Sequence, residues 1–175
     1  MSSVALVSVL GPDRVGLVAE IAERLFNAGV NLGDTTFAAL GSGAEFVALC
    51  ELPEGMAAGD IEADLKQAPA LEGTEIRVVP YPFGSPGVTG KISHRIAISG
   101  GDQLGLVARL AEVFKRYESN IVRLEARKLS EADRDLYVTR FDVFIPPEQV
   151  NACLATVSNT AGSLGLSCDV DESSF

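Results

Sequence analysis

The feature that most constrains this chain is an internal repeat. Residues 11–22 read Gly-Pro-Asp-Arg-Val-Gly-Leu-Val-Ala-Glu-Ile-Ala, and residues 100–111 read Gly-Gly-Asp-Gln-Leu-Gly-Leu-Val-Ala-Arg-Leu-Ala. The offset of 89 between residues 11 and 100 holds without a gap, and it also pairs Glu23 with Glu112 and Asn31 with Asn120. A period of this length is too long for a solenoid repeat and suits a small domain. The chain of 175 residues therefore has room for two copies of one module.

Both copies show the same order of hydrophobic patterns. Continuous apolar runs with β-branched residues predict strands, and apolar residues spaced three and four apart predict helices. The first copy predicts strands at 4–10, 30–40, 45–52 and 74–79, with helices after Asp13 and at 59–67. The second copy predicts strands at 92–99, 120–129, 136–145 and 164–170, with helices at 104–117 and from Pro147.

The order strand-helix-strand-strand-helix-strand is that of the split βαβ, or ferredoxin-like, arrangement. We therefore expect an α+β fold with two βαββαβ domains, each a four-stranded antiparallel sheet with two helices on one face. The segment 83–90 is rich in proline and glycine, which predicts a linker between a first domain of residues 1–82 and a second of residues 91–175. The other face of each sheet stays open unless something covers it.

The helix that follows the first strand differs in detail between the copies. We expect Asp13 to cap the first such helix by accepting a hydrogen bond from the Gly16 amide, and Gly29 to end it in a left-handed conformation. The inward residues are expected to be Val18, Ile21, Ala22 and Leu25 in one copy and Val107, Leu110, Ala111 and Phe114 in the other. In the second copy Leu106, Leu110, Val113 and Tyr117 extend the apolar stripe, whereas Arg24 takes the place of Val113 in the first. A wider stripe needs another neighbour, so we expect this helix to contact another domain or subunit and the protein to be a homo-oligomer.

Charge and hydropathy limit the classes of function. Lys and Arg number 14 against 24 Asp and Glu, so the formal net charge is −10. Affinity for nucleic acid comes mostly from neutralising phosphates, so we expect no direct contact with nucleic acid and any effect on transcription to pass through another protein. Apolar runs are too short to span a membrane, and the first residues lack the basic region of a signal peptide. We therefore expect a cytoplasmic protein that does not contact a membrane.

Residue types typical of catalysis or metal binding are sparse. Cys50, Cys153 and Cys168 are far apart, which fits small buried side chains in a reducing compartment better than a disulfide or a metal site. His94 is the one histidine and lies in a predicted strand, where a structural role is favoured over a catalytic one. We therefore expect no enzymatic activity, no metal and no cofactor.

The strand-to-helix turn at 11–18 holds the most chemistry. The start of a helix presents unpaired backbone N–H groups and the positive end of the helix dipole, which suit a carboxylate or a phosphate. Gly16, and Gly105 in the second copy, lie in the first helical turn, where glycine is less stable than alanine by about 1 kcal/mol. Two interpretations stay open: close approach of a ligand, or tight packing of the helix on the sheet.

The string at 11–18, with Asn31 after the helix, resembles the ACT domain, and the pattern of both copies fits that family over nearly the entire chain. ACT domains are ferredoxin-like regulatory modules that bind amino acids or similar small ligands, usually where two domains meet. A chain of two such domains is similar to the group of glycine cleavage system transcriptional repressors, which act by contacting a DNA-binding regulator. The resemblance therefore implies an amino acid or similar small ligand and a protein partner such as a DNA-binding regulator.

Ligand contacts in that family come from the first strand–helix turn and the start of the second strand. Carried over by position, they are Asp13, Arg14, Val15, Gly16, Leu17, Asn31 and Leu32 in the first copy, and Asp102, Gln103, Leu104, Gly105, Leu106, Asn120 and Ile121 in the second. The second copy has Gln103 where the first has Arg14, and the lost cation implies a second site that is weaker, different or absent. Asn31 and Asn120 either bind the ligand or hold the helix–strand turn.

Three classes of function stay open. The leading hypothesis is a regulatory protein that binds an amino acid and modulates transcription of amino-acid metabolism through a protein partner. The alternatives are a regulatory subunit of a metabolic enzyme and a dimerisation module without a ligand.

Overall fold

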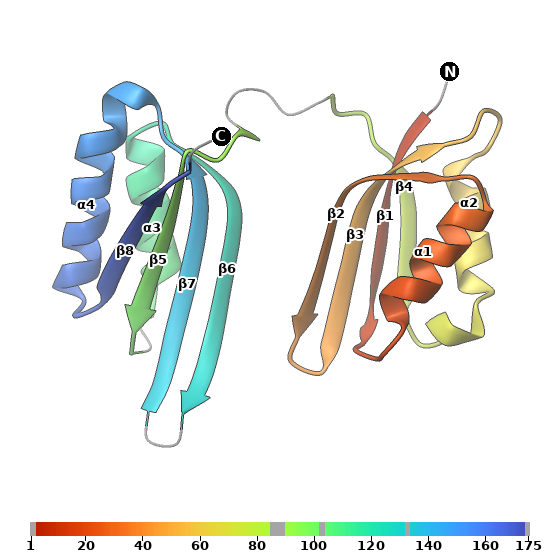
Figure 1. Cartoon of the computed structure of the whole chain (residues 1–175), viewed down its shortest axis with the longest axis horizontal. Helices are drawn as coiled ribbons and strands as arrows, with labels where there is room; N and C mark the ends of the chain where they lie inside the picture. Colours follow the sequence, from red (N-terminus) through yellow and green to blue (C-terminus); the bar gives the residue numbers. More distant parts are fainter. Residues whose placement is uncertain (1–2, 85–89, 102–103, 132–133, 174–175) are drawn as a thin grey trace. The chain divides into compact units, whose positions relative to one another are not determined.

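The computed structural model describes residues 3–84, 90–101, 104–131 and 134–173 (Figure 1). The chain divides into two compact units, Met1–Gly84 and Ser85–Phe175, which we call the first and the second domain. In each domain a four-stranded antiparallel sheet carries two α-helices on one face. The two ferredoxin-like βαββαβ domains expected from the sequence are therefore confirmed.

The first domain is built around its first strand. Its elements are β1 (Ser3–Pro12), α1 (Leu17–Asn27), β2 (Asn31–Leu40), β3 (Gly43–Leu52), α2 (Ala58–Lys66), a 3-10 turn (Pro69–Leu71) and β4 (Glu75–Pro80). The strand order is β2-β3-β1-β4, so β1 lies inside the sheet. Alternate apolar side chains of β1 point to the helices, and Ala5, Val7 and Val9 are fully buried there.

The second domain repeats this plan. Its elements are β5 (His94–Gly100), α3 (Leu106–Arg116), β6 (Asn120–Glu131), β7 (Arg134–Phe144), a 3-10 turn (Pro147–Gln149), α4 (Val150–Ser163) and β8 (Ser167–Glu172). The strand order is β6-β7-β5-β8, and the rings of Phe114 and Phe141 meet in the core with centroids 5.4 Å apart. β8 begins three residues later than expected, because Leu164 ends α4 and Gly165 follows in a left-handed conformation with φ 71°.

Helix α1 does not begin as the sequence predicts. The expected cap by Asp13 is wrong: the cap residue is Gly16, with φ 89° and ψ −5°, and no described side chain bonds to the helix start. The Asp13 N–H instead donates to the carbonyl of Ser42 at 2.9 Å, which ties the loop to the β2–β3 turn. Leu17 N–H donates to Arg14 O at 3.3 Å, so a tight turn precedes the helix. The expected end is confirmed, since Gly29 follows α1 with φ 74°.

The residues that α1 and α3 bury against the sheet differ by one position from those that the sequence predicts. Ile21 and Leu25 are buried as expected, but the first inward residue is Leu17, and Val18 is 39% exposed. The same holds in the second domain, where Leu106 is buried and Val107 is 36% exposed. A helix that starts at Leu17 aligns residues 17, 21 and 25 at intervals of four, which turns Val18 to the side.

The wider apolar stripe of α3 is covered within its own domain, so the premise that this stripe needs a neighbour from another domain or subunit is wrong. Val113 is 6% exposed and belongs to the core of the second domain, and the Tyr117 hydroxyl meets Thr156 Oγ1 of α4 at 2.7 Å. Helix α4 has 14 residues, whereas α2 has nine, and the longer helix provides the covering surface. In the first domain Arg24 occupies this place and donates to Glu20 at 2.9 Å and to the carbonyl of Asp64 at 3.2 Å.

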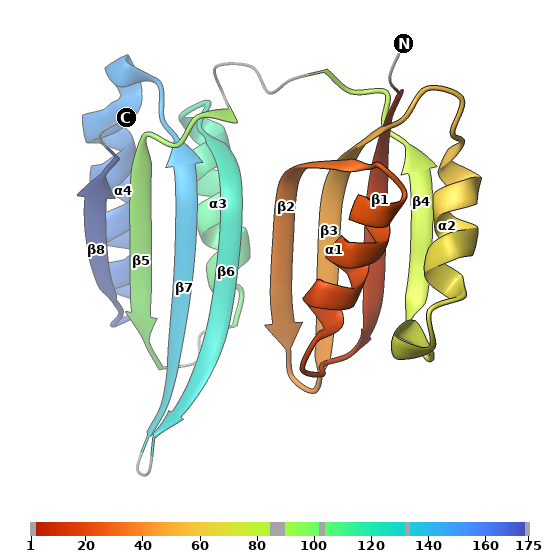
Figure 2. The ribbon, with the colours of Figure 1, turned by 45° about the vertical axis from the view of Figure 1, so that its right-hand side comes forward.

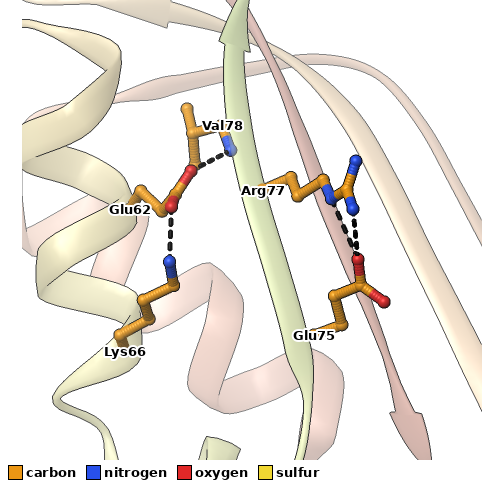
Figure 3. A network of polar contacts seen from close by, with 5 residues as sticks. All are labelled: Glu62, Lys66, Glu75, Arg77 and Val78. Carbon is orange, nitrogen blue, oxygen red and sulfur yellow. Dashed lines mark hydrogen bonds and ion pairs between the residues drawn. The ribbon is translucent and has the colours of Figure 1, made fainter.

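Helix α2 is fastened to the outer strand β4 by Glu62 (Figure 3). The Glu62 carboxylate accepts one hydrogen bond from Lys66 and another, of 2.9 Å, from the backbone N–H of Val78. These two hydrogen bonds hold the pKa of Glu62 below its ordinary value. On the same strand Arg77 pairs with Glu75 at 2.8 Å.

Candidate functional site

A shallow hollow lies at the start of α1 in the first domain. Its volume is about 530 Å³ and it opens to solvent. It is lined by the β1–α1 loop, the first turn of α1 and one residue of β2: Asp13, Arg14, Val15, Gly16, Leu17, Val18, Ala19 and Phe37. Five of the seven positions that the sequence predicts for the first copy therefore line one concavity.

The backbone of the loop gives the hollow its polar side. In any α-helix the N–H groups of the first turn have no acceptor inside the helix. In α1 the first closed helical bond runs from Glu20 N–H to Gly16 O at 2.9 Å, and Leu17 N–H already donates to Arg14 O, so the N–H groups of residues 18 and 19 lie ahead of the regular ladder. These groups and the positive end of the helix dipole favour a negatively charged atom in the hollow.

Arg14 is the one positively charged side chain of the lining. It is exposed, and its Nη2 donates to the carbonyl of Glu72 at 3.2 Å in the segment between α2 and β4. This contact fixes the guanidinium at the rim while other N–H donors stay available, because a guanidinium carries five. Arg14 can therefore contribute a charged hydrogen bond to a carboxylate at the edge of the hollow.

Apart from the exposed Asp13, the other side chains of the lining are apolar. The side chain of Val15 is fully exposed, Val18 is 39% exposed and Phe37 is 43% exposed. Leu17 is buried at 3% and belongs to the core, so it supports the hollow rather than presenting its side chain to a ligand. A ligand that enters the hollow thus meets N–H groups and a cation on one side and aliphatic and aromatic carbon on the other.

The backbone conformation at residue 16 favours a glycine. Its φ of 89°, like the 80° of Gly105, lies in the left-handed region that side chains with a Cβ disfavour. A Cβ added at either glycine would meet nothing within 4 Å among the described residues. Tight packing of helix on sheet therefore does not explain these glycines, and their presence is accounted for without a ligand.

The glycines that allow close packing are Gly11 and Gly100. A Cβ at Gly11 would lie 2.5 Å from Thr74 Cγ2 and 3.1 Å from Thr74 Cα. A Cβ at Gly100 would collide with Cδ2 at the end of the Leu166 side chain, whereas the Leu166 backbone is 3.5 Å away. The two positions correspond in the repeat. Each lets the end of the first strand pass close to the chain that leads into the fourth strand.

Asn31 and Leu32 lie away from the hollow. They start β2 just after the C-terminal end of α1, and a helix of 11 residues separates its two ends by about 16 Å. Asn31 Nδ2 donates to Glu51 of the neighbouring strand at 3.4 Å. The two groups of positions carried over from the resemblance are therefore not brought together within the first domain.

The second domain shows the same loop geometry. Gly105 has ψ 8°, and Arg109 N–H donates to its carbonyl at 3.0 Å, as Glu20 does to Gly16. Leu104 is 98% exposed and Leu106 is 8% exposed, which repeats the contrast between Val15 and Leu17. Asp102 and Gln103 lie outside the described residues. Asn120 and Ile121 begin β6, and Ile121 packs against the core.

Phe37, Val18 and Ala19 line the hollow but were not predicted. Val18 is the last residue of the motif string and Ala19 follows it directly, so the predicted contacts could have been extended to both. Phe37 gave no such signal, because every residue of the edge strand β2 is exposed or half-buried and no alternation marks one face.

The other reactive side chains are buried or isolated. His94 is 6% exposed, and its Nδ1 meets the Ser93 hydroxyl at 2.9 Å. All three cysteines are free, and burial raises the pKa of Cys50 to about 11. Within the described residues no group of three or more His, Cys, Asp or Glu could hold a metal ion. In that same part of the chain, no helix combines the length and the apolar character needed to cross a membrane.

Comparison with known proteins identifies the first domain. Residues 3–79 match the family model of the ACT domain. The crystal structure of an unknown protein from Galdieria sulphuraria is 25% identical in sequence, covers 99% of this chain and 100% of its own, and superposes with a TM-score of 0.78. The crystal structure of a protein proposed to be a glycine cleavage system transcriptional repressor is 14% identical in sequence and superposes with a TM-score of 0.64. The match covers 98% of this chain and 97% of that protein. No curated protein matches the sequence significantly.

The matched residues span nearly all of the first domain, from β1 into β4, so the first domain belongs to the ACT family. The second domain has the same order of elements and the same sheet topology. Both similar structures extend over the two domains, so the tandem arrangement is a property that this chain shares with them.

Proposed function

We propose that this protein is a regulator whose first domain, an ACT domain, binds an amino acid or a similar small carboxylate in the hollow at the start of α1. The observation that carries the proposal is the joining of five motif residues, Asp13 to Leu17, with Phe37 around one concavity. The α-carboxylate would accept hydrogen bonds from the N–H groups of the first helical turn and from Arg14. The remainder of the ligand would lie against Val15, Val18 and Phe37.

Binding would act on the protein by a shift of population. A ligand that contacts one conformation of the domain better than another favours that conformation, and the gain is limited to the difference in affinity. The loop that lines the hollow is tied to the β2–β3 turn through Asp13 and Ser42 and to the α2–β4 segment through Arg14 and Glu72. A ligand that orders this loop would therefore also reach these two segments of the domain.

The output of the regulator would be contact with another protein, which we propose to be a DNA-binding regulator in the cytoplasm. The net charge of −10 supports an indirect effect on transcription, because a protein that binds DNA itself must neutralise phosphates. The free cysteines, of which Cys50 and Cys153 are buried and Cys168 is half-buried, fit a reducing compartment. The proposal assigns no chemical reaction to this chain.

The test is a thermal-shift screen of the full chain against each of the twenty amino acids at millimolar concentration. A ligand that binds only the folded state stabilises it, by about 2.7 kcal/mol at a hundredfold excess over Kd. We expect at least one amino acid to raise Tm in proportion to the logarithm of its concentration. If none of the twenty changes Tm, the amino-acid proposal is contradicted.

Site-directed variants locate the binding in the hollow. Arg14→Gln introduces the residue type that the second copy has at this place, and we expect it to raise Kd at least tenfold in isothermal titration with the amino acid found in the screen. Arg77→Gln is the matched control, because Arg77 is also exposed but lies on β4 and pairs with Glu75. Equal effects of the two substitutions would contradict the proposed site.

A further inference from the structure

The sheet of the first domain leaves an apolar face uncovered by its helices. The register of the strands places on that face, which we call the open face, the residues Val4, Leu6, Ser8 and Leu10 of β1, Glu45, Val47, Leu49 and Glu51 of β3, and Glu75, Arg77 and Val79 of β4. Val4, Leu10 and Val79 are 37%, 48% and 46% exposed. An exposed apolar surface of this kind, bordered by charges, is typical of a contact with another protein.

The border of the open face is acidic. Glu45 and Glu75 flank Leu10, and Glu51 lies beside Val4. Arg77 is the one cation among the described residues of this face, and it is paired with Glu75. Stacking two open faces on each other would bring carboxylates together, which opposes association. The surface that fits is one that joins apolar side chains to Lys or Arg.

The second domain carries most of the positive charge of the chain. The two domains share the 24 acidic residues equally, but residues 1–84 hold only four of the 14 Lys and Arg and residues 85–175 hold the other ten. The first domain is thus strongly acidic, and the second is close to neutral. The Lys and Arg residues that could face the acidic border therefore lie mainly in the second domain.

The β6–β7 hairpin of the second domain projects beyond its sheet (Figure 2). The β5 ladder ends at the pair Gly100 and Tyr137, but β6 and β7 continue to pair from Lys128 and Tyr137 to Glu131 and Arg134. In the first domain β1 pairs with β3 up to Gly43, where the β2–β3 hairpin itself ends. We call residues 127–131 and 134–138 the arm. Two-stranded ribbons have little stability of their own in water, so an arm of this length is suited to rest on another surface.

The arm joins apolar and basic side chains. Leu129 pairs with Leu136 and Arg127 with Val138, so the register puts these four residues on one side of the ribbon. Leu129 is 45% exposed and Arg127 is exposed, while Leu136 and Val138 are half-buried. On the other side Lys128 lies over the Tyr137 ring at 5.8 Å. This is the combination that the open face requires.

We propose that the arm of one chain docks on the open face of the first domain of a second copy, so that two chains form a reciprocal pair with twofold symmetry. Leu129, Leu136 and Val138 would cover the apolar centre of the open face, and Arg127 would approach its acidic border at Glu45. A closed twofold pair makes the contact twice, which strengthens the association without a new surface.

The experiment measures the mass of the full chain in solution by light scattering coupled to size exclusion. We expect the wild-type protein to be a dimer, and both Leu129→Glu on the arm and Val79→Glu on the open face to raise the dimer Kd more than tenfold, so that monomers are seen at micromolar concentration. Leu129 and Val79 are both exposed, and unchanged circular dichroism and Tm show that the variants fold. Phe26→Glu is the matched control, because Phe26 is 79% exposed on α1 and belongs to neither surface; it should leave the mass unchanged.

Mixing the two variants tests the reciprocal contact. The Val79→Glu chain keeps its arm and the Leu129→Glu chain keeps its open face, so an equimolar mixture should form heterodimers that neither variant forms alone. A monomeric wild-type protein would overturn the proposal. So would dimers that resist Leu129→Glu, dimers that dissociate equally with Phe26→Glu, or a mixture that stays monomeric.

Discussion

The two domains have one topology, yet the faces of their sheets that the helices leave open are different in kind. In the first domain that face is apolar at its centre. In the second, the register sets Arg123, Asp142, Arg95 and Asp171 side by side across four strands. Asp142 lies 3.8 Å from Arg95 and 3.9 Å from Arg123, so its carboxylate sits between two guanidinium groups.

This difference shows which constraints a repeated module keeps. The residues under the helices follow the same plan in both copies, because each domain needs its own core. The left-handed glycines at the helix starts also recur, because the loop geometry demands them. The outer surfaces carry no such demand. They are free to specialise, one as an apolar contact and one as a network of cross-strand ion pairs.

The largest expected effect concerns the helix pair that differs most between the domains. Val113→Glu buries a charge without a partner in the core of the second domain and should destabilise it by about 3–5 kcal/mol. Arg24→Gln, at the matching position of the first domain, removes only partly exposed ion pairs and should cost about 1 kcal/mol or less. Urea unfolding followed by circular dichroism measures both. A folded Val113→Glu variant that merely loses its assembly would show that α3 faces a subunit instead of α4.

A second test separates the two kinds of glycine in the repeat. Gly11→Ala inserts a methyl group against Thr74, and overpacking of this kind costs about 1–3 kcal/mol. Gly16→Ala meets open space and suffers only from its left-handed backbone, at about 1–2 kcal/mol. Gly16→Asn should recover part of that loss, because asparagine tolerates the left-handed conformation, whereas Gly11→Asn should be at least as damaging as Gly11→Ala. Thermal unfolding of the four variants decides, and equal behaviour at both positions would contradict the distinction.

The smallest effect is the acid sensitivity of the contact that Glu62 makes between α2 and β4 in the first domain. Because Glu62 has a lowered pKa in the folded protein, its carboxylate stabilises the fold above its ordinary pKa, and this stabilisation is lost as pH falls through the folded value. Glu62→Gln should therefore make the stability of the chain less dependent on pH in the acid range. Glu75→Gln is the control for an exposed ion pair on the same strand. If Glu62→Gln leaves the dependence of the unfolding free energy on pH unchanged, Glu62 does not stabilise the fold in this way.

The topology could be predicted from the sequence because the repeat shows the pattern of each strand and helix twice. Periodicity located the strands and helices, and Gly29 marked the end of α1 correctly. The start of α1 was missed because Asp13 and Gly16 have the spacing of a capped helix, while a left-handed glycine satisfies the same spacing without a cap. The cover of α3 was missed because the pattern of α4 does not reveal that this helix is five residues longer than α2.

The candidate site was predictable in part for the same reason. Residues 13–17 are contiguous, so a motif that locates one of them at the start of the helix locates all five there. Phe37 comes from an edge strand in which exposure is nearly uniform, and its approach to the helix start depends on the pairing of Phe37 with Phe46. Such a register is a property of the folded sheet and has no local signature.

The most direct test of the central claim is a titration of the isotopically labelled full chain with the amino acid that raises Tm, followed by backbone amide NMR shifts. We expect the largest changes at residues 14–19 and Phe37 of the first domain, and smaller changes at Leu104, Gly105 and Leu106, where the corresponding copy has lost its arginine. Changes that spare residues 14–19, or that are larger at the second loop than at the first, would contradict a ligand site at the start of α1.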